Sequence, residues 1–322
     1  ARSTPGAWPT RAGRIDLSGS RVRVLCLAGP TGTGKTGAAL AVARDIPAVV
    51  VNFDSRQVYA DFPIVTAQPS VAERAVCPHR LYGFVPTDQA LTAAAFADMA
   101  RAEVRRAAAK GLLPILVGGT GLYLKAILQG LAPIPPIPAG VRQAVLARLK
   151  AEGASALHAE LSRLDPDYAA RIHPNDSQRK ARALEVFQAT GKTLTWWHAG
   201  GSGAAPFEPL LLGLGADLEA LTPVLAARVE AMLAAGALDE VRAALERCPD
   251  PETPGFSGIG CAELVAHLRG ESTLDEAVAR WIRNTRAYAK RQLTWFKAVP
   301  GLRWLAPGDG AGVLAAVREW RG

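Results

Sequence analysis

One stretch near the start of the sequence has the residue types and the spacing of a phosphate-binding loop. Residues 29–36 read GPTGTGKT, which matches G-x-x-x-x-G-K-[ST], and they follow an apolar run at 22–28. Glycines there let backbone N–H groups turn toward phosphate oxygens, and the N-terminus of a following helix adds its dipole. We expect Lys35 to neutralise phosphate and Thr36 to place its hydroxyl on Mg²⁺. The residues expected to line this site are Gly29, Pro30, Thr31, Gly32, Thr33, Gly34, Lys35 and Thr36.

A carboxylate elsewhere in the sequence limits the reactions that the phosphate loop could serve. Ordinary phosphate-loop NTPases hold Mg²⁺ partly through an Asp at the end of another strand, whereas the apolar run 113–117 is followed by Gly-Gly-Thr. The acid at a strand end is Asp54, after the run 48–53. At the carboxyl end of a neighbouring strand it would face the phosphate loop, to hold Mg²⁺ or to take a proton from a nucleophile. The alternative, a helix cap or Asx-turn Asp, stays open from the residues alone.

These residues need a sheet to position them. Apolar runs alternate with stretches of helical spacing, which is typical of a parallel sheet covered by helices on both faces. The expected strands are 22–28, 48–53, 80–85, 113–117, 210–215 and 303–305. The expected helices of this part are 38–43, 96–110, 122–128, 222–235, 238–246, 261–268 and 274–299.

The alternation breaks at residues 132–138, APIPPIP, where four prolines in seven residues exclude a helix or a central strand. Only helical patterns follow, at 140–152, 155–164, 166–172 and 176–190. We therefore predict an α/β chain with a sheet like that of phosphate-loop NTPases, interrupted by an all-helical insertion domain. The predicted parts are a flexible tail at 1–20, the core at 21–132 and 206–322, and the insertion at 133–205.

Composition limits the function classes. Hydrophobic residues make up 49% and charged residues 20% of 322 residues, which excludes a disordered chain. No apolar run approaches the roughly 20 residues needed to span a bilayer, so we expect no membrane. The four cysteines lack zinc-ligand spacing, and a reducing cytoplasm fits them. No long apolar heptad seam appears, which favours a monomer.

The charge balance indicates a polyanionic partner. Lys and Arg number 37 against 29 acids, a net +8, and 29 of these cations are Arg, whose guanidinium matches phosphate geometry. Cations concentrate at 171–182 and at 280–297. Within the second segment, Arg283, Arg286 and Lys290 form a row along one helix face, which suits a phosphate backbone. The alternative is a solvated face, the usual fate of charge runs.

Together these residues resemble the family of tRNA dimethylallyltransferases, also called tRNA isopentenyltransferases. The resemblance covers about residues 22–300 in order. The matching stretches are GPTGTGKT at 29–36, DSRQVY at 54–59, PHRL at 78–81, LVGGTGLY at 116–123, RIHPND at 171–176, QRKARALE at 178–185, GK at 191–192, TR at 285–286, AKRQ at 289–292 and WF at 295–296.

The resemblance implies an activity and a role for each site. The phosphate loop would bind the diphosphate of dimethylallyl diphosphate, and the acceptor would be N6 of the adenine immediately 3′ of the tRNA anticodon (position 37). Asp54 would be the general base, while Lys35, Thr36, Mg²⁺ and Arg228 would neutralise the leaving diphosphate. Thr120 and Arg142 would lie around the flipped base. The remaining expected tRNA contacts are Ser55, Arg56, Gln57, Gln178, Arg179, Lys180, Ala181, Arg182, Arg286 and Lys290, besides Asp54 itself.

The sequence departs from the family pattern in one segment. A Gly-Tyr-Lys/Arg pattern is usual in the third tRNA-contacting segment, but here Cys261 replaces the aromatic residue, Ala262 replaces the cation, and Ser257 stands where an Arg can occur. Weaker or altered tRNA contact at 257–262 is therefore a hypothesis.

Three other functions remain as alternatives. An adenylate isopentenyltransferase acting on AMP, ADP or ATP would share the loop and Asp54 without needing the basic insertion. A small-molecule kinase or NTPase lacks its expected strand-end Asp. An RNA-binding protein with a relic loop does not explain the intact Lys35, Thr36 and Asp54.

Overall fold

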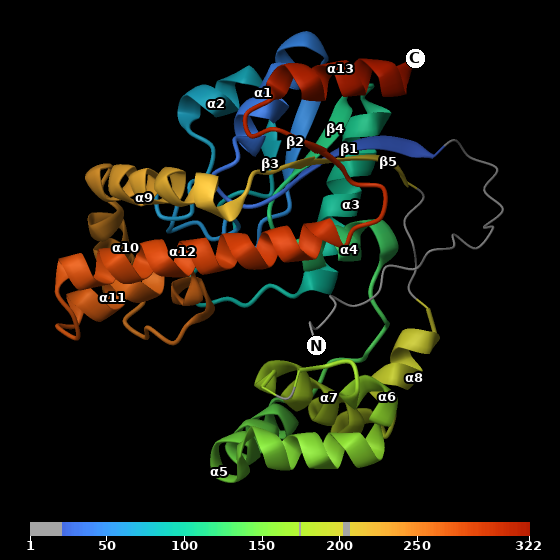
Figure 1. Ribbon diagram of the computed structural model, residues 1–322, viewed down its shortest axis with the longest axis vertical. Helices are drawn as coiled ribbons and strands as arrows, with labels where there is room; N and C mark the ends of the chain where they lie inside the picture. The colour runs from blue at the N-terminus through green and yellow to red at the C-terminus, as the bar shows by residue number, and fades with distance from the viewer. Residues whose placement is uncertain (1–20, 174, 202–206) are drawn as a thin grey trace. The chain divides into compact units, whose positions relative to one another are not determined.

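The computed structural model describes residues 21–173, 175–201 and 207–322 (Figure 1). These residues form two compact units. The helical unit comprises residues 129–201, and the sheet unit comprises residues 21–128 and 207–322. The predicted flexible tail, 1–20, lies outside the described residues.

The sheet unit is built on six parallel strands. They are β1 (Val22–Ala28), β2 (Ala48–Asn52), β3 (His79–Arg80), β4 (Leu113–Val117), β5 (Phe207–Leu214) and β6 (Arg303–Leu305). Their order in the sheet is β3-β2-β4-β1-β5-β6, which places the apolar strands β1 and β4 at its centre. This confirms the predicted α/β class.

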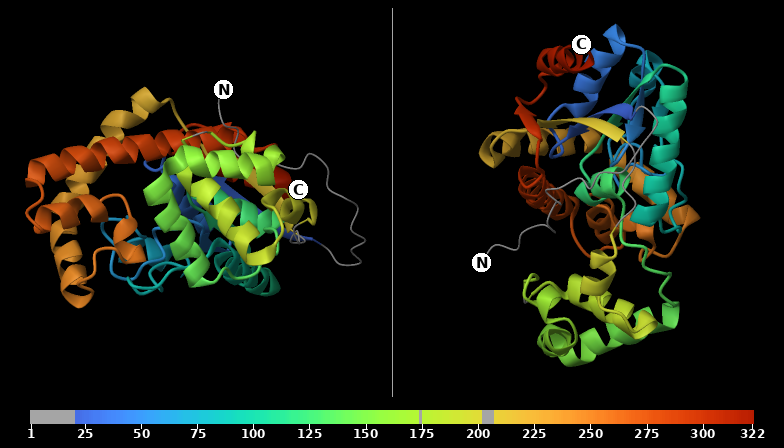
Figure 2. Two further views of the ribbon diagram at one scale, coloured as in Figure 1. Left: turned by 90° about the horizontal axis from the view of Figure 1, so that it is seen from below. Right: turned by 90° about the vertical axis from the view of Figure 1, so that its right-hand side faces the viewer.

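Helices cover both faces of the sheet. The helices that contact the strands most are α1 (Lys35–Asp45), α3 (Ala93–Ala109) and α13 (Gly310–Arg321). The unit also contains α2 (Val71–Val76), α4 (Gly121–Gln129), α9 (Leu218–Ala234), α10 (Ala237–Arg247), α11 (Cys261–Leu268) and α12 (Leu274–Lys297), with a 3₁₀ turn at Pro254–Ser257. Leu25, Val50 and Ile115 point to one face, where they pack in one cluster with residues of α1 and α13. Figure 2 shows α3 on the opposite face.

The predicted strand at 80–85 is wrong in extent. β3 pairs with β2 only at His79 and Arg80. Leu81 follows with φ +63° and Gly83 with φ +59°, and left-handed backbone cannot continue a strand. The sequence patterns also missed α13, α2 and, in the second unit, α8 (Leu194–Ala199); α2 and α8 have only six residues each.

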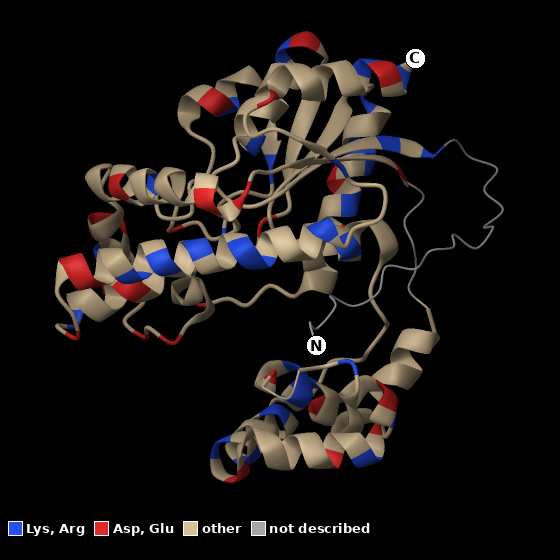
Figure 3. Cartoon of the chain, in the orientation of Figure 1, with Lys and Arg blue, Asp and Glu red and all other residues tan. Residues whose placement is uncertain are grey.

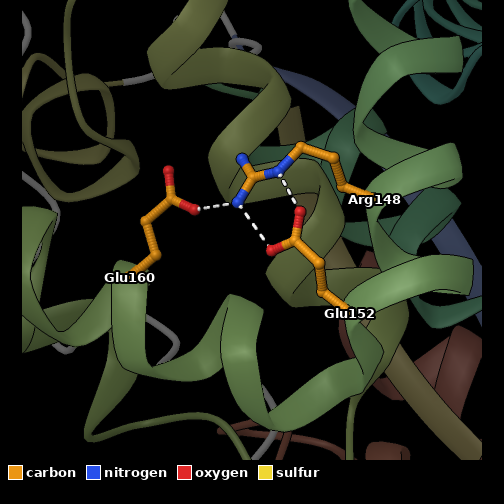
Figure 4. Close-up of polar contacts among 3 residues, drawn as sticks. All are labelled: Arg148, Glu152 and Glu160. Atoms are coloured by element: carbon orange, nitrogen blue, oxygen red, sulfur yellow. Dashed lines mark hydrogen bonds and ion pairs between the residues drawn. The ribbon is translucent and has the colours of Figure 1, made fainter.

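The helical unit has its own apolar core, formed by residues such as Val145, Leu157 and Leu184. Its helices are α5 (Ala139–Leu164), α6 (Pro166–Ala169), α7 (Ser177–Thr190) and α8. The first of them is kinked at Gly153, where φ is +80° and ψ 169°, so two helical segments meet there as the sequence predicts. Arg148 bridges the kink, because its guanidinium bonds Glu152 at 2.9 Å and Glu160 at 2.6 Å (Figure 4).

Among the described residues, no single helix is long and apolar enough to cross a membrane. The consecutive helices α9 and α10, bent by 61° to each other, meet the length and composition requirement only as a pair.

Candidate active site

The phosphate loop joins the end of β1 to the start of α1, as its motif requires. Gly29 has φ +139°, and a Cβ there would lie 2.2 Å from the carbonyl oxygen of Leu214. Gly34 has φ +75° and caps the N-terminus of α1. Thr33 is buried, and its hydroxyl donates to the Pro30 carbonyl at 2.9 Å. Glycine is therefore needed where the chain touches β5 and where the helix begins.

Lys35 and Thr36 occupy the first turn of α1. The Lys35 ammonium donates to the Pro30 carbonyl at 2.7 Å. Burial lowers the pKa of Lys35 to about 8; the field of Asp54 opposes this shift and that of Arg228 adds to it. The three charged side chains are thus within electrostatic reach of one another. A desolvated ammonium beside the loop is well placed to meet a phosphate anion.

Arg228, on α9, completes this charged group. Burial lowers the pKa of its guanidinium, while the carboxylates of Asp54 and Glu73 act in the opposite direction. The side chain is only partly exposed. Two cations on α1 and α9 therefore share the field of the Asp54 carboxylate, a combination that the family resemblance implied and no local pattern predicted.

Asp54 lies just past β2 and is held by its neighbours. Its backbone N–H donates to Asn52 Oδ1 at 2.7 Å, and the Asn52 amide donates to the carbonyls of Asp54 and Leu81. Asp54 Oδ1 accepts the Arg56 N–H at 2.9 Å. The Asx-turn considered from the sequence is thus present. The other carboxylate oxygen of Asp54, Oδ2, takes no part in this bond. Turn formation and a catalytic role are compatible for this carboxylate.

The loop after β4 lies directly against the Asp54 segment. A Cβ on Gly118 would fall 2.5 Å from the Phe53 carbonyl carbon, so glycine permits this approach. Thr120 Oγ1 accepts the Ser55 N–H at 2.9 Å. The hydroxyl of Tyr288, on α12, lies close enough to interact with the Thr120 side chain, and burial raises the pKa of Tyr288. Thr120 and Asp54 are therefore brought to one place by the ends of two adjacent strands.

Arg56 links this site to the segment where the family pattern is broken. Its Nη1 donates to Ser257 Oγ in the 3₁₀ turn at 2.9 Å and to the Pro254 carbonyl at 3.3 Å. Cys261, which stands where the family usually has an aromatic residue, is fully buried at the start of α11. This cysteine therefore offers no surface for stacking on a base.

Gln57, the next residue expected to contact tRNA, is held by the chain itself. Its side-chain amide donates to the carbonyl of Thr66 at 3.1 Å and to that of Ala67 at 2.6 Å. The residue is partly exposed. Its carbonyl oxygen is not used by these two bonds, so a contact with RNA through that oxygen stays a prediction.

The cation row on α12 is exposed, as its spacing predicts. Arg283, Arg286 and Lys290 are all exposed, and Figure 3 shows Lys and Arg along this helix. Arg286 also donates to Thr222 Oγ1 of α9 at 2.9 Å. The row is available to a ligand, and whether RNA binds it stays a prediction.

The expected RNA contacts of the helical unit differ among themselves. Arg142 and Gln178 are exposed. Arg179 is partly exposed and pairs with Asp176 at 3.3 Å, and exposed Arg182 pairs with Glu185 at 3.4 Å.

Two of these expected contacts are buried in the structure. Lys180 is fully buried, and its ammonium donates to the Ala154 carbonyl at 2.7 Å, next to the kink in α5. Ala181 is 3% exposed. Both lie on the face of α7 that packs into the unit's core, and contact with RNA at these two positions stays a prediction. Lys180 is buried because it is turned by about 100° round the helix from its neighbour Arg179.

Sequence reasoning assigned no role to Asn52, Tyr288 or Gln292. Gln292 is 4% exposed and makes bonds to both site loops. The sequence contained a sign of this role, because Gln292 is a polar residue on the apolar face of the 274–297 helix. Charge patterning drew attention to the opposite face instead.

A magnesium ion fits the oxygen donors of this site. The described residues contain no group of three or more His, Cys, Asp or Glu able to hold a metal. Mg²⁺ usually keeps several waters and takes one or two protein oxygens together with substrate phosphates. Thr36, next to Lys35 in α1, and Asp54 are the residues that could supply such oxygens.

The sequence matches a known family over most of its length. The model of the family described as IPP transferase matches residues 57–299. The chain belongs to the IPP transferase family. This IPP transferase is 52% identical over 297 residues to a tRNA dimethylallyltransferase of Maridesulfovibrio salexigens, covering 92% of this chain and 97% of that protein.

Solved structures of the family share the fold. A full-length tRNA isopentenylpyrophosphate transferase from Bacillus halodurans aligns with a TM-score of 0.66 at 30% identity, covering 94% of this chain and 100% of that one. A eukaryotic dimethylallyltransferase acting on tRNA aligns with a TM-score of 0.76 at 28% identity, covering 93% and 77%. The IPP transferase fold thus holds across distant sequences.

Proposed function

We propose that this IPP transferase moves a dimethylallyl group from dimethylallyl diphosphate to N6 of the adenine immediately 3′ of the anticodon in tRNA. One observation carries the proposal: Asp54, Lys35 and Arg228 converge beside the phosphate loop of a chain that belongs to this family. The strand-end Asp of ordinary phosphate-loop NTPases is replaced by Gly118 and Gly119 after β4.

The reaction breaks the bond between the allylic carbon and the diphosphate oxygen, and forms a bond from that carbon to N6. Lys35 and Arg228 stabilise the negative charge that grows on the leaving diphosphate. Asp54 accepts the proton that N6 loses, so diphosphate and a protonated carboxyl are formed together with the alkylated base. Thr36 would hold Mg²⁺, which when bound would supply positive charge at the diphosphate oxygens.

The acceptor side must admit an unstacked base. A base within a stacked loop cannot reach Asp54, so extrusion from the anticodon loop is expected. Thr120, which is bonded to Ser55 and lies near Tyr288, would line the place of that base. The exposed cations Arg286 and Lys290 would contact the backbone of the anticodon stem-loop, as would Arg142, Gln178, Arg179 and Arg182 of the helical unit.

The setting of the reaction is part of the same proposal. All four cysteines are free, which fits a reducing compartment, and we place the enzyme in the cytoplasm. We expect it to act as a monomer.

The proposal is tested by offering competing acceptors. The protein is incubated with labelled dimethylallyl diphosphate and Mg²⁺, together with undermodified tRNA, AMP or ATP in separate reactions. We expect label in tRNA, mapped by nuclease digestion to the adenine after the anticodon. Label in AMP and none in tRNA would instead identify an adenylate isopentenyltransferase, and ATP hydrolysis without label transfer would identify an NTPase.

A further inference from the structure

One side chain of α12 touches both loops of the site. Gln292 Oε1 accepts the N–H of Thr31 in the phosphate loop at 3.0 Å, and its Nε2 donates to the Gly119 carbonyl at 2.9 Å. The side chain is 4% exposed. A single amide therefore joins the loop after β1 to the loop after β4, and each of its two ends is used by a different loop.

Neighbouring turns of α12 contact the same β4 loop. Tyr288, four residues before Gln292, lies close enough to interact with Thr120. Trp295, three residues after it, packs so closely on Gly121 that a Cβ there would lie 1.9 Å from its indole nitrogen. Residues three and four apart share a helix face. One face of α12 thus contacts three consecutive residues after β4: Gly119, Thr120 and Gly121.

This contact matters because the proposed reaction joins atoms held by different loops. The phosphate loop holds the leaving group, while Asp54 and Thr120 lie on the acceptor side. Displacement of about 1 Å between reacting groups can reduce the rate about 100-fold. We propose that Gln292 is a positioning residue for prenyl transfer, fixing the phosphate loop relative to the Thr120 loop. This inference rests on the proposed function.

A contact with RNA is a poor explanation of Gln292. Its side chain is buried, and both ends of its amide are bonded to backbone groups of the protein. Its replacement should therefore alter the chemical step more than the affinity for tRNA.

The test compares variants that remove one or both bonds. Gln292→Met keeps the length of the side chain and removes both bonds. Gln292→Glu keeps an acceptor for the Thr31 N–H and loses the donor to Gly119. The matched surface control is Gln89→Ala, an exposed glutamine outside both site loops. Steady-state and single-turnover rates are measured with tRNA, and tRNA affinity is measured separately by fluorescence anisotropy.

We expect Gln292→Met to lower kcat by about 30- to 100-fold, with tRNA affinity within about twofold of wild type. Gln292→Glu should also lower kcat, and should raise KM for dimethylallyl diphosphate because its carboxylate repels phosphate. Gln89→Ala should behave as wild type. Rates are taken well below each variant's melting temperature, and the single-turnover amplitude counts the folded, active fraction.

The outcomes separate the inference from the function on which it rests. A folded Gln292→Met enzyme with near-normal kcat would overturn the positioning role. So would a fall in kcat that is fully explained by a smaller fraction of active enzyme. A loss of tRNA affinity equal to the loss of kcat/KM would make Gln292 an RNA contact instead. If wild-type protein itself transfers no label to tRNA, the proposed function fails first.

Discussion

The phosphate loop and helix α7 both carry cations within a short stretch of sequence, but the two regions keep them in different surroundings. Lys35 is desolvated, bonds a carbonyl of its own loop and lies in the field of Asp54 and Arg228. On α7, Arg179 and Arg182 lie nearer to solvent, each paired with an acid three residues away.

The difference concerns what each kind of cation can do. A buried cation has lost its hydration and interacts strongly with a small anion at close range. An exposed cation paired on its own helix contributes little to stability and can exchange its partner for an RNA phosphate. Lys180 on α7 belongs to neither group, since it is buried against the Ala154 carbonyl. Position in the fold, rather than residue type, assigns the role.

The largest effect should come from the carboxylate at the buried site. Asp54→Asn keeps the shape of the loop but cannot accept the N6 proton, so turnover should fall about 10²- to 10⁴-fold. Binding of tRNA, measured by filter retention, should remain. The exposed Asp88 supplies the control variant, Asp88→Asn. Near-normal turnover of Asp54→Asn would exclude Asp54 as the base.

The next effect concerns pH at the same site. Because the pKa of Lys35 is lowered to about 8, its charge is present below pH 8 and is lost as the pH rises through that value. Affinity for inorganic diphosphate, measured by calorimetry, should fall about tenfold between about pH 7 and pH 9. Lys35→Arg stays charged over this range and reports the titration of diphosphate itself. Identical pH profiles for the two proteins would contradict the assignment.

A smaller effect should appear at the exposed cations of α7. Arg179→Ala combined with Arg182→Ala should weaken tRNA binding and reduce the slope of log affinity against log salt by about 1.4 to 1.8. The matched control removes two exposed arginines of α3, Arg105 and Arg106, and changes net charge equally. If both double variants change the slope alike, the effect is one of net charge and not of α7.

The smallest effect on RNA binding should come from Lys180. Lys180→Met removes a buried ammonium that bonds Ala154, so the salt slope and tRNA affinity should stay within about twofold of wild type. Thermal melting is measured alongside, to detect any change in the stability of the helical unit. A salt slope reduced as much as by an α7 arginine would return Lys180 to the RNA-binding surface.

Local patterns predicted much of the fold. The apolar runs 22–28 and 113–117 are strands β1 and β4 with the expected bounds, and 261–268 is helix α11. The patterns failed where backbone conformation, rather than the spacing of apolar side chains, determines where an element ends. The predicted strand 80–85 ends after Arg80 because Leu81 adopts a positive φ. Short helices such as α2 have too few residues to show a period.

The sequence by itself determined the chemistry of the phosphate loop, since its glycines, Lys35 and Thr36 are contiguous and the strand–loop–helix context is local. It also singled out Asp54 as an acid at a strand end. The family resemblance pointed to Arg228, but tertiary structure alone brought the distant groups together there. Arg228 and Gln292 lie on α9 and α12, far from Lys35 in the chain, and reach the site because these two helices pack against each other beside it. The same kind of packing, in the helical unit, buries Lys180 while leaving Arg182 exposed, because nearby helix positions point in different directions.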